Sequence, residues 1–280
     1  GLMGGYYAAA QGEPREVAEA IRDHYKPVGQ GDDVPTAPVT VAVSLADKLD
    51  TLAQFFAEDM KPTGSKDPFA LRRAGLGILE LLSRNNLRAH LFGAVNNAMA
   101  LRAPAHPSRV DEVLQFLIDR LKVQQREAGV RHDLIDAVFA LGGEDDLVRL
   151  LARVHALQSF VGTDDGANLL AGYKRAANIL KKEGVETAEW KPLGYAPESD
   201  EAALIAALDA AEPAAADAVG NEDFEAAMAA LATLRAPIDA FFETVTVNDA
   251  DPAKRDARLA LLARVRAAVH SVADFSRIEG

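Results

Sequence analysis

Two groups of cations are spaced as in proteins that contact the phosphates of a nucleic acid. The first group lies in the segment YKRAANILKK and, on a helical wheel, forms a stripe made of Lys174, Asn178 and Lys181, flanked by Arg175 and Lys182. Cations contact phosphates and an amide reaches base edges, so the stripe suits RNA. The same pattern is typical of the solvated side of an amphipathic helix, and the residues alone favour this simpler interpretation.

The second group surrounds the loop from Lys61 to Lys66, with sequence KPTGSK. This loop lacks the first glycine of a phosphate-binding loop and follows no predicted strand, so a nucleotide site is not indicated. We expect Asp67–Pro68 to begin a helix, which would place both lysines beside free backbone N–H groups that attract an anion. Arg72 and Arg73 follow within two turns. A plain capping loop with solvated lysines is the favoured alternative.

Metal and nucleophile chemistry finds little support in the residues. The six histidines are scattered, without an HExxH motif. His132-Asp133 is a literal His-Asp pair, and Asp47 stands where a later ligand of an HD phosphohydrolase falls, but the pair lies downstream of it, in the wrong order. We therefore predict no metal ligand and no catalytic residue, with Asp47 and Asp50 solvated or paired with Lys48 and its neighbours. No GxSxG motif occurs.

Composition restricts the class of protein further. The 280 residues suit two or three domains, and the net charge of −12 excludes a general polyanion binder. The chain has no cysteine, which predicts a reducing, cytoplasmic setting. No apolar run approaches the ~20 residues of a membrane span, and no signal peptide is visible at the start. The opening GLMGGYYAA is typical of the interior of a domain, so we expect a C-terminal portion of a longer protein.

Apolar residues recur at helical spacing nearly throughout, and strand alternation is almost absent. The pattern predicts an all-α protein of two or three helical bundles, with a connector at residues 184–199. The expected helices cover residues 14–25, 39–58, 68–84, 87–102, 107–128, 131–141, 144–160, 164–183, 200–219, 221–246 and 252–275.

Several segments resemble the β subunit of the bacterial heterotetrameric glycyl-tRNA synthetases. The most specific is LADKLDTLAQFFAEDMKPTGSKDPFALRRAGLGILELL, which spans Leu45–Leu82. The flanking matches are collinear and run from the first residues to the last. They are GLMGGYYAAAQGEPREVAEAIRDHYKP, VLQFLIDRLKVQQREAGVRHDLIDAVFA, GYKRAANILKKEG and DPAKRDARLALLARVRAAVHSVADFSRIE.

The resemblance implies a division into three parts. Residues 1–86 would be the remainder of an HD-like domain, residues 87–163 a helical linker domain, and residues 164–280 a DALR-type anticodon-binding bundle. The literal Asp-Ala-Leu-Arg string is absent, and the PFALR at residues 68–72 is not equivalent to it.

The resemblance also implies partners and a division of labour. In this family the α subunit carries the aminoacylation site and uses ATP and Mg²⁺, while the β subunit supplies most tRNA recognition. The expected partners are therefore tRNA(Gly) and the α subunit in an α2β2 enzyme, with no DNA, no membrane and no cofactor bound by this chain. The Lys174–Lys182 stripe becomes the favoured tRNA contact and the Lys61–Arg73 region a second one. A scaffold built on the alanine-rich helices, or an HD-type metal phosphohydrolase, remains the alternative.

Overall fold

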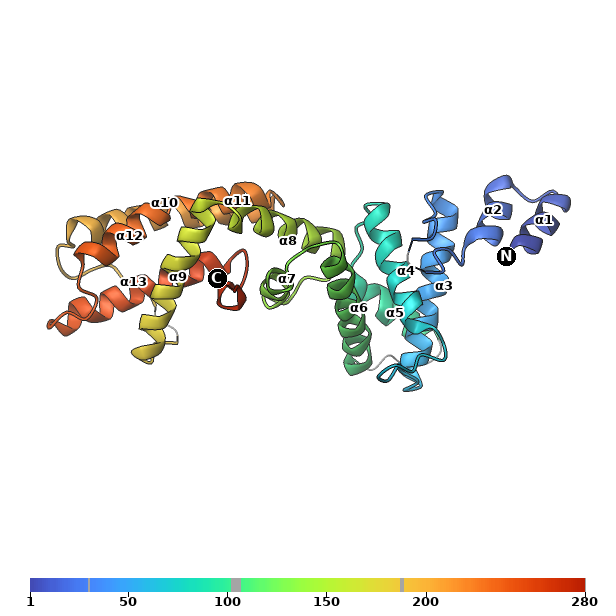
Figure 1. Ribbon diagram of the computed structural model, residues 1–280, viewed down its shortest axis with the longest axis horizontal. Helices are drawn as coiled ribbons and strands as arrows, with labels where there is room; N and C mark the ends of the chain where they lie inside the picture. The colour runs from blue at the N-terminus through green and yellow to red at the C-terminus, as the bar shows by residue number, and fades with distance from the viewer. Residues whose placement is uncertain (30, 102–106, 187–188, 280) are drawn as a thin grey trace. The chain divides into compact units, whose positions relative to one another are not determined.

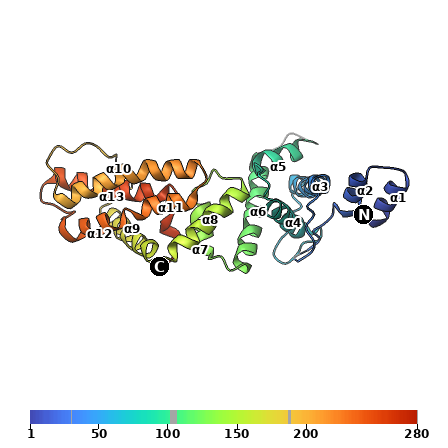
Figure 2. The same cartoon turned by 90° about the horizontal axis from the view of Figure 1, so that it is seen from above.

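Residues 1–29, 31–101, 107–186 and 189–279 are described by the computed structural model, shown in two orientations in Figures 1 and 2. Within these ranges the chain forms α-helices and one 3₁₀ helix, and the only strand-like pairing is an isolated bridge between Thr63 and Lys66. The predicted all-α class is thus confirmed. None of the described helices is long and apolar enough to cross a membrane.

The helices form two compact units. Unit 1 comprises Gly1–Gly129 and Glu144–Arg149, and unit 2 comprises Val130–Gly143 and Leu150–Gly280. Each unit has buried apolar side chains of its own. The separate linker domain expected at residues 87–163 stays a prediction.

Unit 1 is built from helices that pack in chain order. They are α1 (Leu2–Ala10), α2 (Arg15–Asp23), α3 (Pro38–Ala57), α4 (Leu71–Arg84), α5 (Leu91–Ala100), α6 (Pro107–Glu127) and the first residues of α8 (Leu147–Val161). Helix α1 pairs with α2, α2 rests on α3, and α3 packs against α4, α5 and α6. Leu52, Phe56 and Ile78 lie in this core. Helix α1 was not predicted, and the expected end of the α5 helix at residue 102 lies outside the described residues.

A buried lysine joins α2 to α3. The Lys48 Nζ donates to the Ser44 Oγ at 2.9 Å and to three backbone carbonyls, those of His24 at 3.3 Å, Tyr25 at 3.1 Å and Lys26 at 3.2 Å. Carbonyls at the end of a helix have no intrahelical partner, so the ammonium satisfies groups that would otherwise need water. Burial lowers the pKa of Lys48. Asp47 is exposed, as the solvated alternative predicts, and Asp50 accepts from the Gln54 side chain, so neither carboxylate is a hydrogen-bond partner of Lys48.

Unit 2 contains α7 (His132–Phe139), the rest of α8, α9 (Asp164–Lys182), α10 (Ser199–Gly220), α11 (Phe224–Ala232), α12 (Arg235–Thr244), α13 (Pro252–His270) and the 3₁₀ helix η1 (Phe275–Arg277). Helix α9 packs against α13 and α12, and α10 packs against α11, α12 and α13. The segment η1 contacts both α7 and α9.

Two predicted helices of this unit are interrupted. The helix expected at residues 221–246 is divided into α11 and α12, because Pro237 has no N–H to continue the hydrogen-bond ladder. The helix expected to reach Phe275 ends at His270. Four residues later, the Asp274 N–H donates to the Ala137 carbonyl of α7 at 2.9 Å. This bond directs the chain toward α7 and not along the axis of α13.

The interior of unit 2 contains a fully buried guanidinium, that of Arg258 on α13. It donates to the carboxylates of Glu198 at 2.6 Å, Asp249 at 2.9 Å and Glu201 at 3.3 Å, and to the Thr246 carbonyl at 2.8 Å. Glu198 and Glu201 form the capping box of α10. Arg258 therefore fixes the start of α10 and the loop before α13 to one point.

We expect Arg258→Ala to lower the free energy of unfolding by about 3–5 kcal/mol, because the buried Glu201 carboxylate would lose its counter-charge. The matched control is Arg235→Ala. Its pair with Asp165 leaves the two side chains 38% and 61% exposed, so a loss of at most about 1 kcal/mol is expected. Urea unfolding followed by circular dichroism measures both. Equal losses in the two variants would contradict a structural role of the buried cluster.

Candidate RNA-binding surfaces

Helix α9 is held in a defined orientation by its ends and by its buried face. The Thr163 Oγ1 accepts from the Gly166 N–H at 3.0 Å, which caps the first turn. Acidic residues stand in that first turn and lysines in the last, as the helix dipole favours. The predicted inner face is confirmed by four buried side chains, those of Leu169, Tyr173, Ala176 and Leu180.

Tyr173 anchors this inner face to the C-terminal segment. Its ring is 1% exposed and its hydroxyl lies 2.7 Å from the Nε2 of His270. The ring also packs against Phe275, with centroids 5.7 Å apart. Burial raises the pKa of Tyr173 to about 12 and lowers the pKa of His270, although the Asp274 carboxylate 3.4 Å from the His270 Nε2 acts in the opposite direction on the histidine. This contact fixes which side of α9 faces outward.

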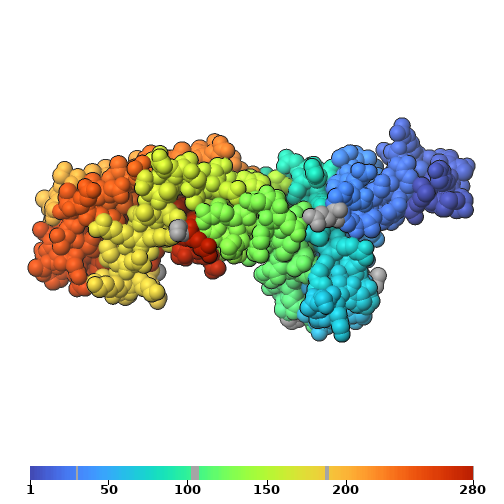
Figure 3. Space-filling view, in the orientation of Figure 1, coloured from blue at the N-terminus to red at the C-terminus, as the bar shows by residue number. Residues whose placement is uncertain are grey.

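The outward side carries the predicted stripe. Arg175, Asn178, Lys181 and Lys182 are exposed and Lys174 is half-buried. In the space-filling view the yellow C-terminal part of α9 lies at the surface of its unit (Figure 3).

The cations of this stripe differ in how they are held. Among the described residues, no carboxylate lies within ion-pair distance of Lys174, Lys181 or Lys182, since the neighbouring Glu183 pairs with Arg255. Arg175 instead places its guanidinium 4.3 Å from the centre of the Phe242 ring. The three lysines are therefore available to a phosphate, and Arg175 is held against α12.

The loop between α3 and α4 is folded tightly on itself. Thr63 and Lys66 exchange backbone hydrogen bonds of 3.1 and 2.9 Å, and the Arg72 Nη2 donates to the Gly64 carbonyl at 2.6 Å. The Lys61 Nζ pairs with Asp59 at 2.8 Å and with Glu112 at 2.6 Å. Lys61 and Arg72 thus hold the loop itself.

Lys66 and Arg73 are the remaining predicted cations of this region. Both side chains are exposed, and neither forms an ion pair with any described residue. Of the four predicted cations, these two are the ones that remain available to an external anion.

The expectation of free N–H groups at the start of α4 is wrong. The helix begins at Leu71 rather than Pro68, because Ala70 adopts a left-handed conformation with φ of 56°. The Asp67 carboxylate accepts from the N–H groups of Leu71 at 2.8 Å and Arg72 at 3.0 Å. The protein thus supplies its own anion to two of the first N–H groups of this helix, and an external phosphate cannot use those two donors.

Phe69 is a further exposed residue of this region that the sequence did not single out as a candidate RNA contact. Its side chain is 45% exposed, although it lies against the ring of Phe55 with centroids 4.3 Å apart. The sequence feature that could have indicated Phe69 is its position, because this aromatic residue lies between Lys66 and the pair Arg72 and Arg73.

The residues considered for an HD-type metal site are not arranged as ligands. Asp47 and His132 are exposed. Asp133 is buried, pairs with Arg131 and accepts from the Glu279 N–H at 2.8 Å, so it holds the C-terminal segment. No group of three or more His, Asp or Glu side chains in the described part of the chain is placed to hold a metal ion. The residues present do not fit an HD metal centre.

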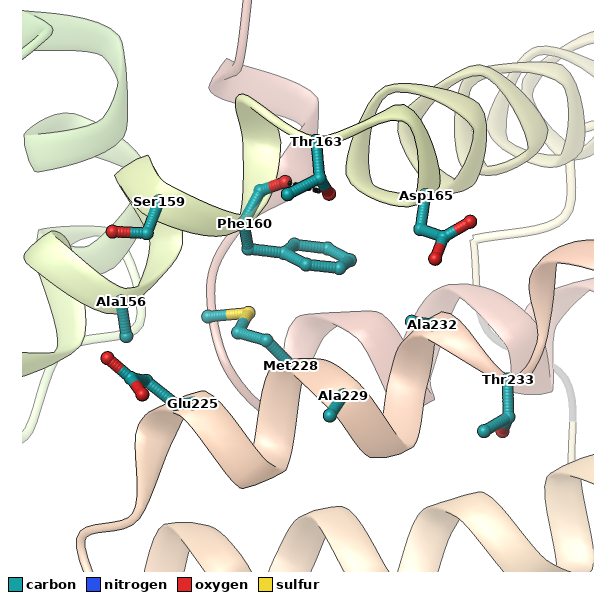
Figure 4. A pocket seen from close by; sticks show the side chains of 10 residues that line it. All are labelled: Ala156, Ser159, Phe160, Thr163, Asp165, Glu225, Met228, Ala229, Ala232 and Thr233. Atoms are coloured by element: carbon teal, nitrogen blue, oxygen red, sulfur yellow. Dashed lines mark hydrogen bonds between the residues drawn. The ribbon is translucent and has the colours of Figure 1, made fainter.

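Unit 2 also has an open apolar groove of about 570 Å³ between α8, the start of α9 and α11. The buried side chains of Phe160 on α8 and Met228 on α11 point toward one another, and the small Ala229 lies next to Met228 on α11 (Figure 4). Glu225 lies at one end of the groove and Asp165 at the other (Figure 4). The described lining is mainly apolar and includes no cation, so this groove suits an apolar group better than an RNA backbone.

Comparison with known proteins matches the two surfaces to two family models. A family model described as glycyl-tRNA synthetase beta subunit matches residues 1–140, and one described as DALR anticodon binding domain matches residues 169–275. The chain belongs to the glycyl-tRNA synthetase beta subunit family. The Lys61–Arg73 region lies inside the first match and the Lys174–Lys182 stripe inside the second. The resemblance noted in the sequence is thereby confirmed.

Relatives with the same description cover the whole chain. The glycine–tRNA ligase beta subunit of Rhodospirillum centenum is 54% identical, that of Paracoccus denitrificans 53% and that of Phenylobacterium zucineum 51%. In each case the alignment covers all of this chain but only 40%, 41% and 40% of the relative. The chain therefore spans about two fifths of the length of these members of the family.

The anchor of α9 predicts a pH dependence. Because burial lowers the pKa of His270 below its ordinary value of 6.5, the unfolded chain binds the proton more readily than the fold does. Stability from this group is complete above about pH 6.5 and falls as the pH drops toward the folded pKa. We expect the native protein to lose more unfolding free energy between about pH 7.5 and 5.5 than His270→Gln, whose amide still accepts from Tyr173. Urea unfolding at both pH values measures this, and equal losses would contradict it.

Proposed function

We propose that this chain is the tRNA-binding part of the β subunit of glycine–tRNA ligase and recognises tRNA(Gly), including its anticodon region. The observation that carries the proposal is the outward face of α9. There, three lysines without carboxylate partners among the described residues lie within the segment that matches the DALR anticodon binding domain. Such an array is suited to neutralise several phosphates at once.

In this proposal the chemistry belongs to the companion subunit. The α subunit carries out ATP- and Mg²⁺-dependent glycylation within an α2β2 enzyme of the cytoplasm, while this chain contributes no catalytic residue and binds no cofactor. Its contribution is to position tRNA(Gly), and no contact with DNA or a membrane is proposed.

The charge distribution supports a selective contact. The chain as a whole carries a net charge of −12, so an RNA meets repulsion except where cations are locally in excess. A synthetase must release its product and reject other tRNAs. Local cations on an acidic background favour that selectivity over tight generic binding.

The double substitution Lys174→Ala/Lys181→Ala tests the α9 surface. We expect the intact synthetase to bind tRNA(Gly) more weakly, with the slope of log K against log salt reduced by roughly one unit per lost phosphate contact. Fluorescence anisotropy at a series of salt concentrations measures both quantities. Arg15→Ala/Arg126→Ala removes two exposed cations of unit 1 and serves as the charge-matched control. An unchanged slope in the lysine variant would remove α9 from the tRNA contact.

A protein-interaction scaffold is the second candidate, and the apolar groove beside the alanine-rich α11 favours it. Ala229→Trp would fill the groove from an exposed position. If tRNA recognition is the function of this chain, the variant should bind tRNA(Gly) as the native protein does. If scaffolding is the function, co-purification with the α subunit should be lost. The control is Ala229→Ser, which adds almost no volume.

A further inference from the structure

We propose that Phe69 is a stacking platform for one unpaired base of the bound RNA, with Lys66 and Arg73 holding the adjoining phosphates. The inference rests on the proposed tRNA-binding function and adds a second contact, in unit 1, of a different physical kind. A stacked base contributes affinity through its π face, whereas the lysines of α9 act through charge.

The geometry of the two rings leaves one face of Phe69 open. The Phe55 and Phe69 rings have centroids 4.3 Å apart and planes inclined by 32°, a tilted contact closer to stacked than to edge-to-face. Phe55 is half-buried on α3 and supports one face of Phe69. Phe69 remains 45% exposed, and since Phe55 covers one side of the ring, we infer that the exposed surface includes the opposite face. Met60, also 45% exposed, extends the apolar surface next to the Phe55 backbone.

The platform is held before any ligand binds. On one side of Phe69, the Asp67 carboxylate is fixed to the first N–H groups of α4. On the other side, Ala70 turns the chain with its left-handed φ of 56°. The bond from Arg72 to the Gly64 carbonyl closes the loop over the same turn. An aromatic ring that is already ordered loses little entropy when a base stacks on it.

The chemistry of the surroundings favours RNA over a protein as the occupant. Lys66 and Arg73 flank the ring in sequence and pair with no carboxylate of the described residues. The nearby Asp59 is neutralised by Lys61 at 2.8 Å and Arg109 at 2.7 Å. Exposed aromatic rings near unpaired cations are what proteins use to bind single-stranded nucleotides, and Phe69 has two such cations close to it in the sequence. Bases inside a duplex are covered on both faces, so the ligand is an unpaired nucleotide of a loop or an end.

The test uses the intact synthetase and tRNA(Gly), with anisotropy measured over a range of salt concentrations. We expect Phe69→Ala to weaken binding by about 5- to 100-fold. The slope of log K against log salt should stay unchanged, because the lost ring carries no charge. Phe69→Trp should retain the affinity. Phe69→Leu, which still packs on Phe55 but has no π face, should bind as weakly as the alanine variant. Lys66→Ala/Arg73→Ala should instead reduce the slope.

Two outcomes would overturn the inference. If Phe69→Leu binds as tightly as the native protein, packing alone matters and no base stacks there. If Phe69→Ala leaves tRNA affinity intact but abolishes co-purification with the α subunit, the surface binds protein.

The outcomes also separate this inference from the proposed function. Normal binding by Phe69→Ala together with weak binding by Lys174→Ala/Lys181→Ala would remove the platform alone. Failure of the native synthetase to bind tRNA(Gly) would remove both. Thermal unfolding of each variant, monitored by circular dichroism, shows whether its fold is intact.

Discussion

The excess of carboxylates over cations is the constraint on which the rest of this structure depends. The chain has 42 Asp and Glu against 30 Lys and Arg, so a cation exposed at random has a high chance of meeting a carboxylate. Many cations do form ion pairs within the chain. Arg258 pairs with three carboxylates and Lys61 with two. The cations that stay without such partners among the described residues are therefore informative, because their charge is available to a polyanion.

In each unit, cations that form ion pairs or hydrogen bonds within the chain hold the elements that carry the unpaired cations. In unit 2, Arg258 joins the start of α10 to α13, and α13 packs against α9, the helix that carries the exposed lysines. In unit 1, Lys61 and Arg72 hold the loop that presents Lys66. The proposed tRNA contacts thus combine an interior held together by ion pairs with unpaired cations at the surface. Long-range attraction is then confined to small areas of an otherwise repulsive protein.

The sequence accounted for most of the helices and for the orientation of α9, because apolar spacing alone decides which face of a helix is buried. Leu169, Tyr173, Ala176 and Leu180 occupy the face that the spacing predicted. Local hydrogen-bond chemistry was harder to foresee. Asp67 does act at the start of α4, yet it reaches N–H groups four and five residues ahead, so the helix begins later than expected.

The sequence by itself determined the helical class, the membership in the glycyl-tRNA synthetase beta subunit family and the stripe on α9. Each of these follows from the order of residues along the chain and needs no knowledge of which residues meet in space. Only the tertiary structure decided which cations are available. Lys61 and Lys66 look alike in the KPTGSK loop, but Glu112, which neutralises Lys61, comes from the distant helix α6. Tertiary structure likewise decided that Phe69 is supported by Phe55 and still exposed. Charge neutralisation and burial depend on neighbours in space, and those neighbours are set by packing between helices rather than by spacing along one of them.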